Sequence, residues 1–153
     1  MSVVTLEGSV EHGQIQLKTN DTKRCLLVTP YSAEFHSLRR LIADALRESG
    51  IELVLLEENM IAGRPTVEPV QLAIERADFI IADLTGSNPN VMYEVGFAHA
   101  LGKPVLPIVQ HRVERVPSDM SGYLYLVYDP SKPDELRRNI QFWASRYVSK
   151  EKR

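Results

Sequence analysis

The feature that most constrains the fold is the alternation of short apolar runs with segments of helical periodicity. Residues 25–28 and 79–82 are apolar without interruption, which is typical of strands that are buried on both faces. Between such runs, apolar residues recur at a period near 3.6, as in helices that pack against a sheet. Because strands that alternate with helices of this length form right-handed β-α-β units, the sequence predicts an α/β fold with a doubly wound, mainly parallel sheet of five strands.

The positions of the expected elements follow from this pattern. We expect strands at residues 25–29, 52–56, 78–83, 105–109 and 124–128, and helices at residues 32–49, 66–76, 90–101 and 133–147. Ser32 and Asn90 are suitable N-terminal caps for the first and third helices, and Gly50 is suited to end the first helix. The spacing of Trp143 and Tyr147 favours a place in the core or at an interface over base stacking.

The chain divides into one main domain and two short flanking segments. Its 153 residues are the length of a single domain, and residues 23–149 carry the alternating pattern. Residues 1–22 form a predicted N-terminal β-hairpin and polar linker, because strand-like segments at 3–6 and 14–17 flank turn residues at 11–13. Residues 150–153 are a charged tail.

Composition excludes several classes of protein. With 18 Lys and Arg against 20 Asp and Glu, the net charge of −2 provides no basic field, so we expect no nucleic-acid polymer as a partner. The single cysteine, Cys25, excludes an intramolecular disulfide. No apolar run is long enough to span a bilayer, and residues 1–11 lack the basic start of a signal peptide. We therefore expect a cytoplasmic protein with no membrane partner.

Polar residues gather after the predicted strand at residues 78–83. In open α/β sheets, ligands bind outside the carboxyl ends of the strands, and Asp83 ends this strand with its carboxylate expected at the rim. If Asn90 caps the next helix, Glu94 falls near the end of the first turn, where the helix dipole favours a carboxylate. Such a carboxylate can attack an anomeric carbon or stabilise an oxocarbenium-like transition state. Taken singly, Asp83 is equally well a turn residue and Glu94 an ordinary helix-start acid.

A long, gapless motif covers this region. It reads ADFIIADLTG at residues 77–86, NPNVMYEVGFAHA at residues 88–100 and GKPV at residues 102–105. In this motif the chain resembles the nucleoside 2-deoxyribosyltransferase superfamily and the related prokaryotic TIR-like nucleotide-binding domains. The resemblance extends more weakly over residues 25–147.

The resemblance implies a flavodoxin-like domain that cleaves N-glycosidic bonds. Glu94 matches the nucleophile of that family, and Tyr31 matches an aromatic hydroxyl that orients the nucleophile or touches the sugar. Asp83 is expected to position the ribose hydroxyls or the nucleophile. The expected substrate-binding residues are Thr29, Thr85, Gly86, Ser87, Asn88 and Asn90. The expected ligand is a nucleoside, a deoxynucleotide or an NAD-like molecule, with no cofactor or metal, and family members suggest a homo-oligomer, dimer or higher.

One position departs from the family pattern. The transferases carry an Asp about eight residues before the third strand, and here that position is Val70, so the acid that protonates the leaving base is unassigned. This departure favours hydrolysis over base exchange.

The alternative to an enzyme is a non-catalytic TIR-like module that senses a nucleotide through the same cleft. Arg64, Arg112 and Arg115 are candidate phosphate contacts, although a solvated arginine is the favoured interpretation of each.

Overall fold

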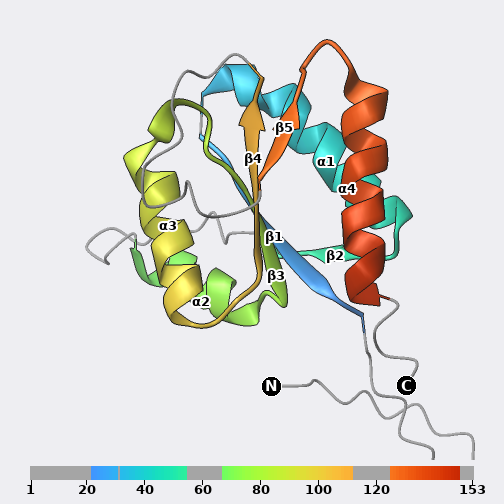
Figure 1. Cartoon of the computed structure of the whole chain (residues 1–153). Helices are drawn as coiled ribbons and strands as arrows, with labels where there is room; N and C mark the ends of the chain where they lie inside the picture. The colour runs from blue at the N-terminus through green and yellow to red at the C-terminus, as the bar shows by residue number, and fades with distance from the viewer. Residues whose placement is uncertain (1–21, 31, 55–66, 112–124, 149–153) are drawn as a thin grey trace, which may run out of the picture.

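The computed structural model describes residues 22–30, 32–54, 67–111 and 125–148. Within these residues the chain alternates between strand and helix, as the sequence predicts (Figure 1). The strands are β1 Arg24–Val28, β2 Glu52–Leu53, β3 Phe79–Asp83, β4 Val105–Gln110 and β5 Leu126–Tyr128. The helices are α1 His36–Glu48, α2 Val67–Arg76, α3 Pro89–Ala100 and α4 Pro133–Val148, with 3-10 turns η1 Ala33–Phe35 and η2 Thr85–Ser87.

The strands form one sheet in the order β2-β1-β3-β4-β5. All four neighbouring pairs are parallel, with Leu26 beside Ile80 and Ile80 in turn beside Val105. This is the flavodoxin-like strand order, so the predicted doubly wound, parallel α/β fold is confirmed. The winding reverses between β1 and β3, because β2 lies on one side of β1 and the later strands lie on the other.

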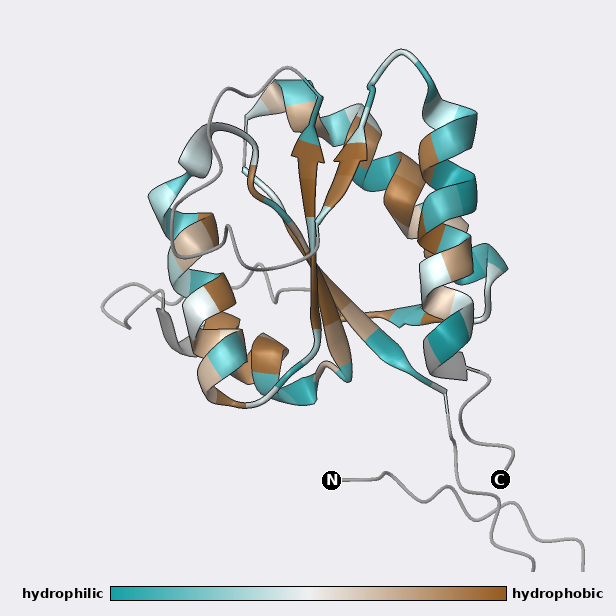
Figure 2. Ribbon diagram, viewed as in Figure 1, coloured by the Kyte–Doolittle hydropathy of each residue, from teal (hydrophilic) through white to brown (hydrophobic). Residues whose placement is uncertain are grey.

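Helices cover both faces of the sheet (Figure 1). On one face α2 and α3 pack against apolar side chains of the central strands, among them Leu26, Ile80 and Ala82. On the other face α1 and α4 pack against Cys25, Phe79 and the strand residues near them. Figure 2 shows the central strands as mostly hydrophobic, which matches burial on both faces.

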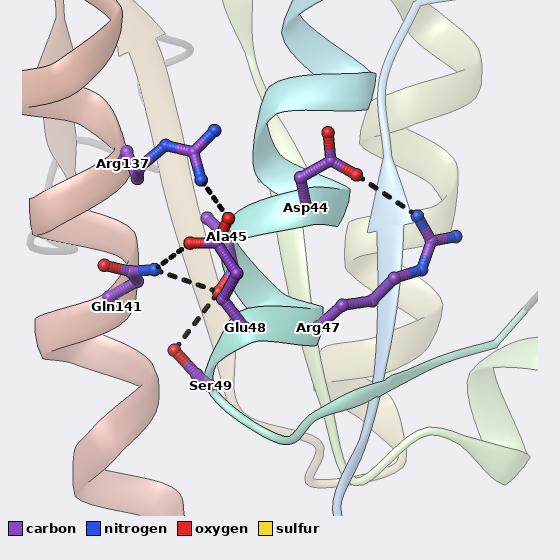
Figure 3. A network of polar contacts seen from close by, with 7 residues as sticks. All are labelled: Asp44, Ala45, Arg47, Glu48, Ser49, Arg137 and Gln141. Carbon is purple, nitrogen blue, oxygen red and sulfur yellow. Dashed lines mark hydrogen bonds and ion pairs between the residues drawn. The ribbon is translucent and has the colours of Figure 1, made fainter.

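Helix α4 is attached to the sheet by aromatic packing and to α1 by polar contacts. Trp143 meets Phe79 edge to face, with 5.2 Å between ring centroids, so its predicted place in the core is confirmed. At the surface, Glu48 of α1 accepts hydrogen bonds from Arg137 Nη1 at 2.6 Å and from Gln141 Nε2 at 3.0 Å (Figure 3). Gln141 also donates to the carbonyl of Ala45 at 3.4 Å. These contacts fix the register of α4 on α1.

Two of the predicted helix starts are wrong. Ser32 is followed by a 3-10 turn, and its hydroxyl donates to Glu34 Oε1 at 3.3 Å and caps no backbone group. Asn88, two residues before Asn90, caps α3 by accepting from the N–H groups of Asn90 and Val91. Pro89 is then the first helical residue, where its missing N–H costs nothing.

The end of the first helix is as predicted, whereas the second strand is shorter. Gly50 follows α1 with a φ of 78°, a conformation that favours glycine. Strand β2 spans two residues, although the N–H of Val54 still donates to the carbonyl of Cys25 at 2.9 Å.

Some of the predictions concern residues that the structure does not describe. The predicted hairpin and linker at residues 1–22 lie almost wholly outside the described residues, as do Tyr31 and the three arginines at 64, 112 and 115. Among the helices that are described, none is long and apolar enough to cross a membrane.

The packing of α4 predicts the effect of two substitutions on the same helix. Ile140 is fully buried, so Ile140→Ala should lower the free energy of unfolding by about 2–5 kcal/mol in urea titrations followed by circular dichroism. Phe142 is 64% exposed and lies under the guanidinium of Arg146, so Phe142→Ala should cost less than about 1 kcal/mol. Equal losses for the two variants would contradict the observed orientation of α4.

Candidate functional site

The candidate site lies at the carboxyl ends of β1 and β3, where the winding of the sheet reverses. The register pairs Val28 with Ala82, so the next residues along the two strands, Thr29 and Asp83, come to the same edge of the sheet. In Figure 1 this is the upper edge, near the starts of α1 and α3. Ligands of doubly wound sheets bind in the crevice at such a point.

Glu94 lines a small cavity at this edge. The cavity has room for about one water molecule and is enclosed by parts of four elements. Glu94 comes from α3 and Arg39 from α1, which cover opposite faces of the sheet. The rest of the lining comes from Leu26, Leu27, Val28, Thr29 and Val70. The sequence-predicted Glu94 and Thr29 are therefore brought together, with Arg39 as a third polar group.

The electrostatics of Glu94 differ from the sequence-based expectation. Because α3 starts at Pro89, Glu94 is its sixth residue and lies beyond the first turn, where the dipole acts most strongly. Burial raises the pKa of Glu94 from the ordinary value of 4.5 to about 7, and the opposing charge of Arg39 does not offset this. Near neutral pH the carboxyl group is thus present in both protonation states.

Asp83 lies in a buried hydrogen-bond network, not at the rim where the sequence suggested it. Its side chain is fully buried, and Oδ2 accepts from the hydroxyl of Tyr128 at 2.5 Å. Its Oδ1 accepts from the N–H of Thr85 at 2.9 Å. Burial raises the pKa of Asp83, while the hydrogen bonds from Thr85 and Tyr128 oppose the rise. Tyr128 of β5 covers the carboxylate, because β4 and β5 extend past this edge.

This network fixes the loop between β3 and α3. Thr85 Oγ1 accepts from the N–H of Gln110 at 3.0 Å, which ties the loop to β4. Gly86 and Ser87 then adopt left-handed φ values of 77° and 51°. Asn88 uses its side chain to cap α3. Thr85 and Asn88 therefore have structural hydrogen bonds of their own, whereas the predicted binding residues Gly86, Ser87 and Asn90 are exposed.

Thr29 is a buried polar residue that directly follows β1 in the sequence. It is 5% exposed, and no hydrogen bond to Oγ1 is found among the described residues. An unpaired buried hydroxyl costs about 1–3 kcal/mol, so its presence in the cavity of Glu94 requires a reason.

Arg39 is not among the site residues predicted from the sequence. A signal was available: Arg39 follows Phe35 by four residues and precedes Ile42 by three, so it sits on the apolar stripe that faces the sheet. A charged residue on such a stripe points to a site at the end of the sheet.

Cys25 is not a candidate nucleophile, because burial raises the pKa of its thiol and keeps it unreactive. No group of three potential metal ligands occurs in the part of the chain that the structure describes.

Comparison with solved structures places the fold among known domains. The CMP N-glycosidase BcmB of Clostridium botulinum is similar, with a TM-score of 0.57 and 21% identity over 79% of this chain and 99% of that one. The TIR domain of the Toll-related receptor TRR-2 from Hydra magnipapillata has a TM-score of 0.60 and 17% identity over 79% and 97%. A prokaryotic SEFIR domain has a TM-score of 0.58 and 15% identity over 80% and 92%.

These similarities confirm the predicted resemblance at the level of fold. No family model matches this chain, and no curated protein is similar to it in sequence. The fold is thus shared by a nucleotide N-glycosidase and by TIR and SEFIR domains. At these identities the likeness does not carry an activity to this chain.

The burial of Glu94 predicts a pH-dependent effect of Glu94→Gln on stability. A pKa of about 7 in the folded chain means that stability is full below the unfolded value near 4.5 and declines as pH rises toward 7. Glutamine does not ionise, so at pH 8 the variant should be more stable than the native chain by about 1–3 kcal/mol, allowing for partial solvent screening. At pH 4.5 the two should differ little.

Urea unfolding at both pH values measures this difference. Glu75→Gln, at an exposed position of α2, is the matched control and should have the same small effect at both. A stability difference between Glu94→Gln and the native chain that does not change with pH would show that Glu94 is solvated.

Proposed function

We propose that this chain is an N-glycosidase that hydrolyses the bond between base and sugar in a nucleoside, nucleotide or NAD-like molecule, with Glu94 as nucleophile. The observation that carries the proposal is the half-buried carboxyl of Glu94 in the cavity at the carboxyl ends of β1 and β3, which Arg39 and Thr29 also line. The fold that it shares with a CMP N-glycosidase supports the same chemistry.

In the proposed reaction the ionised Glu94 attacks C1′ of the sugar as the C1′–N bond breaks. The bonding electron pair leaves with the base, which takes a proton, and the sugar is held as an ester of Glu94. Water then attacks C1′ and loses a proton to solvent, which releases the sugar and restores the carboxylate of Glu94. With a pKa of about 7, a large fraction of Glu94 is ionised at neutral pH, and the partly desolvated carboxylate is a stronger nucleophile than a solvated one.

Val70 supports hydrolysis over base exchange. The position at which the resemblance would place the leaving-base acid lines the cavity of Glu94, and here it presents a hydrocarbon side chain. A proton for the leaving base would then come from solvent. Transfer to a second base requires that base to be held and deprotonated at the same place, and Val70 can do neither.

The remaining predicted site residues take supporting roles in this proposal. Asp83 acts through the loop that it holds, because its buried oxygens are occupied by Tyr128 and Thr85. Tyr31, two residues after Thr29 in the sequence, remains a proposed orienting residue. Residues 23–149 are the proposed functional domain, and assembly into a homo-oligomer remains a prediction.

A signalling module is the second candidate, because TIR and SEFIR domains share the fold with TM-scores of 0.60 and 0.58. Such a module would bind the ligand at the same edge of the sheet and release it unchanged. Saturable binding of a nucleotide with no release of base over hours would favour this candidate.

Removal of the carboxylate tests the enzyme directly. Glu94→Gln should lower the rate of base release by at least about 100-fold, measured by chromatography on a panel of nucleosides, deoxynucleosides, their monophosphates and NAD. Glu135→Gln, at an exposed position of α4, is the control and should keep the native rate. Cleavage by Glu94→Gln at the native rate would exclude Glu94 as the nucleophile.

The pH dependence of the reaction identifies the active form of Glu94. Because the nucleophile is the carboxylate, kcat/KM should rise with pH through an apparent pKa near 7 and then level off. This rise should be absent from the residual activity of Glu94→Gln. A rate that falls as pH increases through 7 would instead assign Glu94 as a general acid.

A further inference from the structure

We propose that one water molecule binds in the cavity between Thr29 and Glu94, and that Thr29 positions the carboxyl group of Glu94 through this water. The inference rests on the proposed function, because it assigns Thr29 a part in the reaction of Glu94. Thr29 is then a positioning residue, since it acts on the reacting group through the water and does not have to touch the substrate.

The size of the cavity selects water as its occupant. The cavity lies at the carboxyl end of β1 and has room for about one water molecule. A sugar ring or a base is much larger than this space, so the substrate lies outside the cavity. The carboxyl group of Glu94 has two oxygens, and when one of them accepts a hydrogen bond from the water, the other can attack C1′.

The side chains that line the cavity also suit a water molecule. Thr29, Arg39 and Glu94 provide a hydroxyl, a guanidinium group with five N–H donors and a carboxyl group. Buried waters typically make about three hydrogen bonds, whereas cavities that stay empty are apolar. The other described lining residues have apolar side chains, so these three are the side chains that can hold the water.

The buried hydroxyl of Thr29 is a second, independent observation. Thr29 is 5% exposed, and its Oγ1 has no hydrogen-bond partner among the described residues. Buried hydroxyls are costly without a partner, and a bridging water is nearly as good a partner as a protein group. One water in this cavity can therefore satisfy Thr29 and hydrogen-bond to Glu94 at the same time.

The water has a defined effect on the ionisation of Glu94. Burial raises the pKa of Glu94, and Arg39 of α1 is the group whose charge opposes the rise. The residues of β1 and α2 that line the cavity have no ionisable side chain. A hydrogen bond to a carboxylate favours the ionised form, so loss of the water should raise the pKa of Glu94 further.

Crystal structures of the native chain and of Thr29→Val test the water directly. In the native chain, one water should lie within hydrogen-bond distance of Thr29 Oγ1 and of a carboxyl oxygen of Glu94. In Thr29→Val, whose side chain has nearly the same shape but no hydroxyl, this water should be missing. A direct hydrogen bond between Thr29 and Glu94, or a native cavity without water, would overturn the proposal.

The stability of Thr29→Val distinguishes a bridged hydroxyl from an unpaired one. If the water bridges the two residues, the valine loses a hydrogen bond, and the Tm should fall by about 2–5 °C. If the hydroxyl is unpaired, the valine removes a costly group and the Tm should rise. A raised Tm would therefore contradict the proposal.

An NMR titration tests the positioning of Glu94 without catalysis. The signal of its carboxyl carbon should have a midpoint at least about half a pH unit higher in Thr29→Val than in the native chain. Thr29→Ser keeps the hydroxyl and should restore the native midpoint. Thr22→Val makes the same change at an exposed position before β1 and is the matched control. Equal midpoints in Thr29→Val and the native chain would show that Thr29 does not act on Glu94.

The kinetics on a cleaved substrate connect the water to the proposed reaction. Because the carboxylate is the attacking form, Thr29→Val should lower kcat at pH 7 by about 3–10-fold, with a smaller effect on KM. The loss should shrink at pH 9, where Glu94 is ionised in both proteins, and Thr29→Ser should recover most of it. Losses of the same size in both variants and at both pH values would overturn the positioning role.

These measurements separate the inference from the proposed function. If no substrate releases its base, the hydrolase is wrong, and the water is still tested by the crystal structures, the Tm and the carboxyl titration. If base release depends on Glu94 while Thr29→Val leaves the carboxyl titration unchanged, the hydrolase stands and the positioning role of Thr29 is wrong.

Discussion

The parallel pairing of β1 with β3 is the constraint on which the rest of the structure depends. It places β2 on one side of β1 and the later strands on the other, so the connections that follow β1 and β3 diverge to opposite faces of the sheet. Helices α1 and α3 therefore begin at the same edge of the sheet and cover its opposite faces. Arg39 and Glu94, far apart in the sequence and on opposite layers, meet there because of this reversal.

Asp83, Glu94 and Thr29 are all buried or half-buried at this edge of the sheet, but they differ in their hydrogen-bond partners. Asp83 is fully buried and satisfied by Tyr128 and Thr85, so it stabilises the loop that leads into α3. Glu94 is half-buried and its pKa rises to about 7, while Thr29 is buried and its hydroxyl has no hydrogen-bond partner among the described residues. Asp83 has its hydrogen bonds within the protein, whereas Glu94 and Thr29 line the cavity at this edge. A carboxyl group with a perturbed pKa beside a cavity is a feature of many functional sites.

The sequence was sufficient for the fold and for part of the site, and the reasons are physical. Uninterrupted apolar runs and the left-handed Gly50 act locally, so the strands and the end of α1 could be predicted from neighbouring residues. The predicted start of α3 is two residues late, because Asn88 and Asn90 are equally good caps. Pro89 between them favours Asn88, since proline is suited to the first position of a helix. The burial of Asp83 depends on Tyr128, 45 residues later, and the role of Arg39 depends on tertiary contact, neither of which local pattern can show.

Capture of the sugar on Glu94 tests the central claim most directly. A 2′-fluoro analogue of a substrate slows the second step of a reaction that passes through a glycosyl ester, so the ester should accumulate and be detected by mass spectrometry of peptides after acid quench. The account predicts a glycosyl adduct on the peptide that contains Glu94, and none in Glu94→Gln. Base release from the analogue without an adduct, or with an adduct on a different residue, would contradict it.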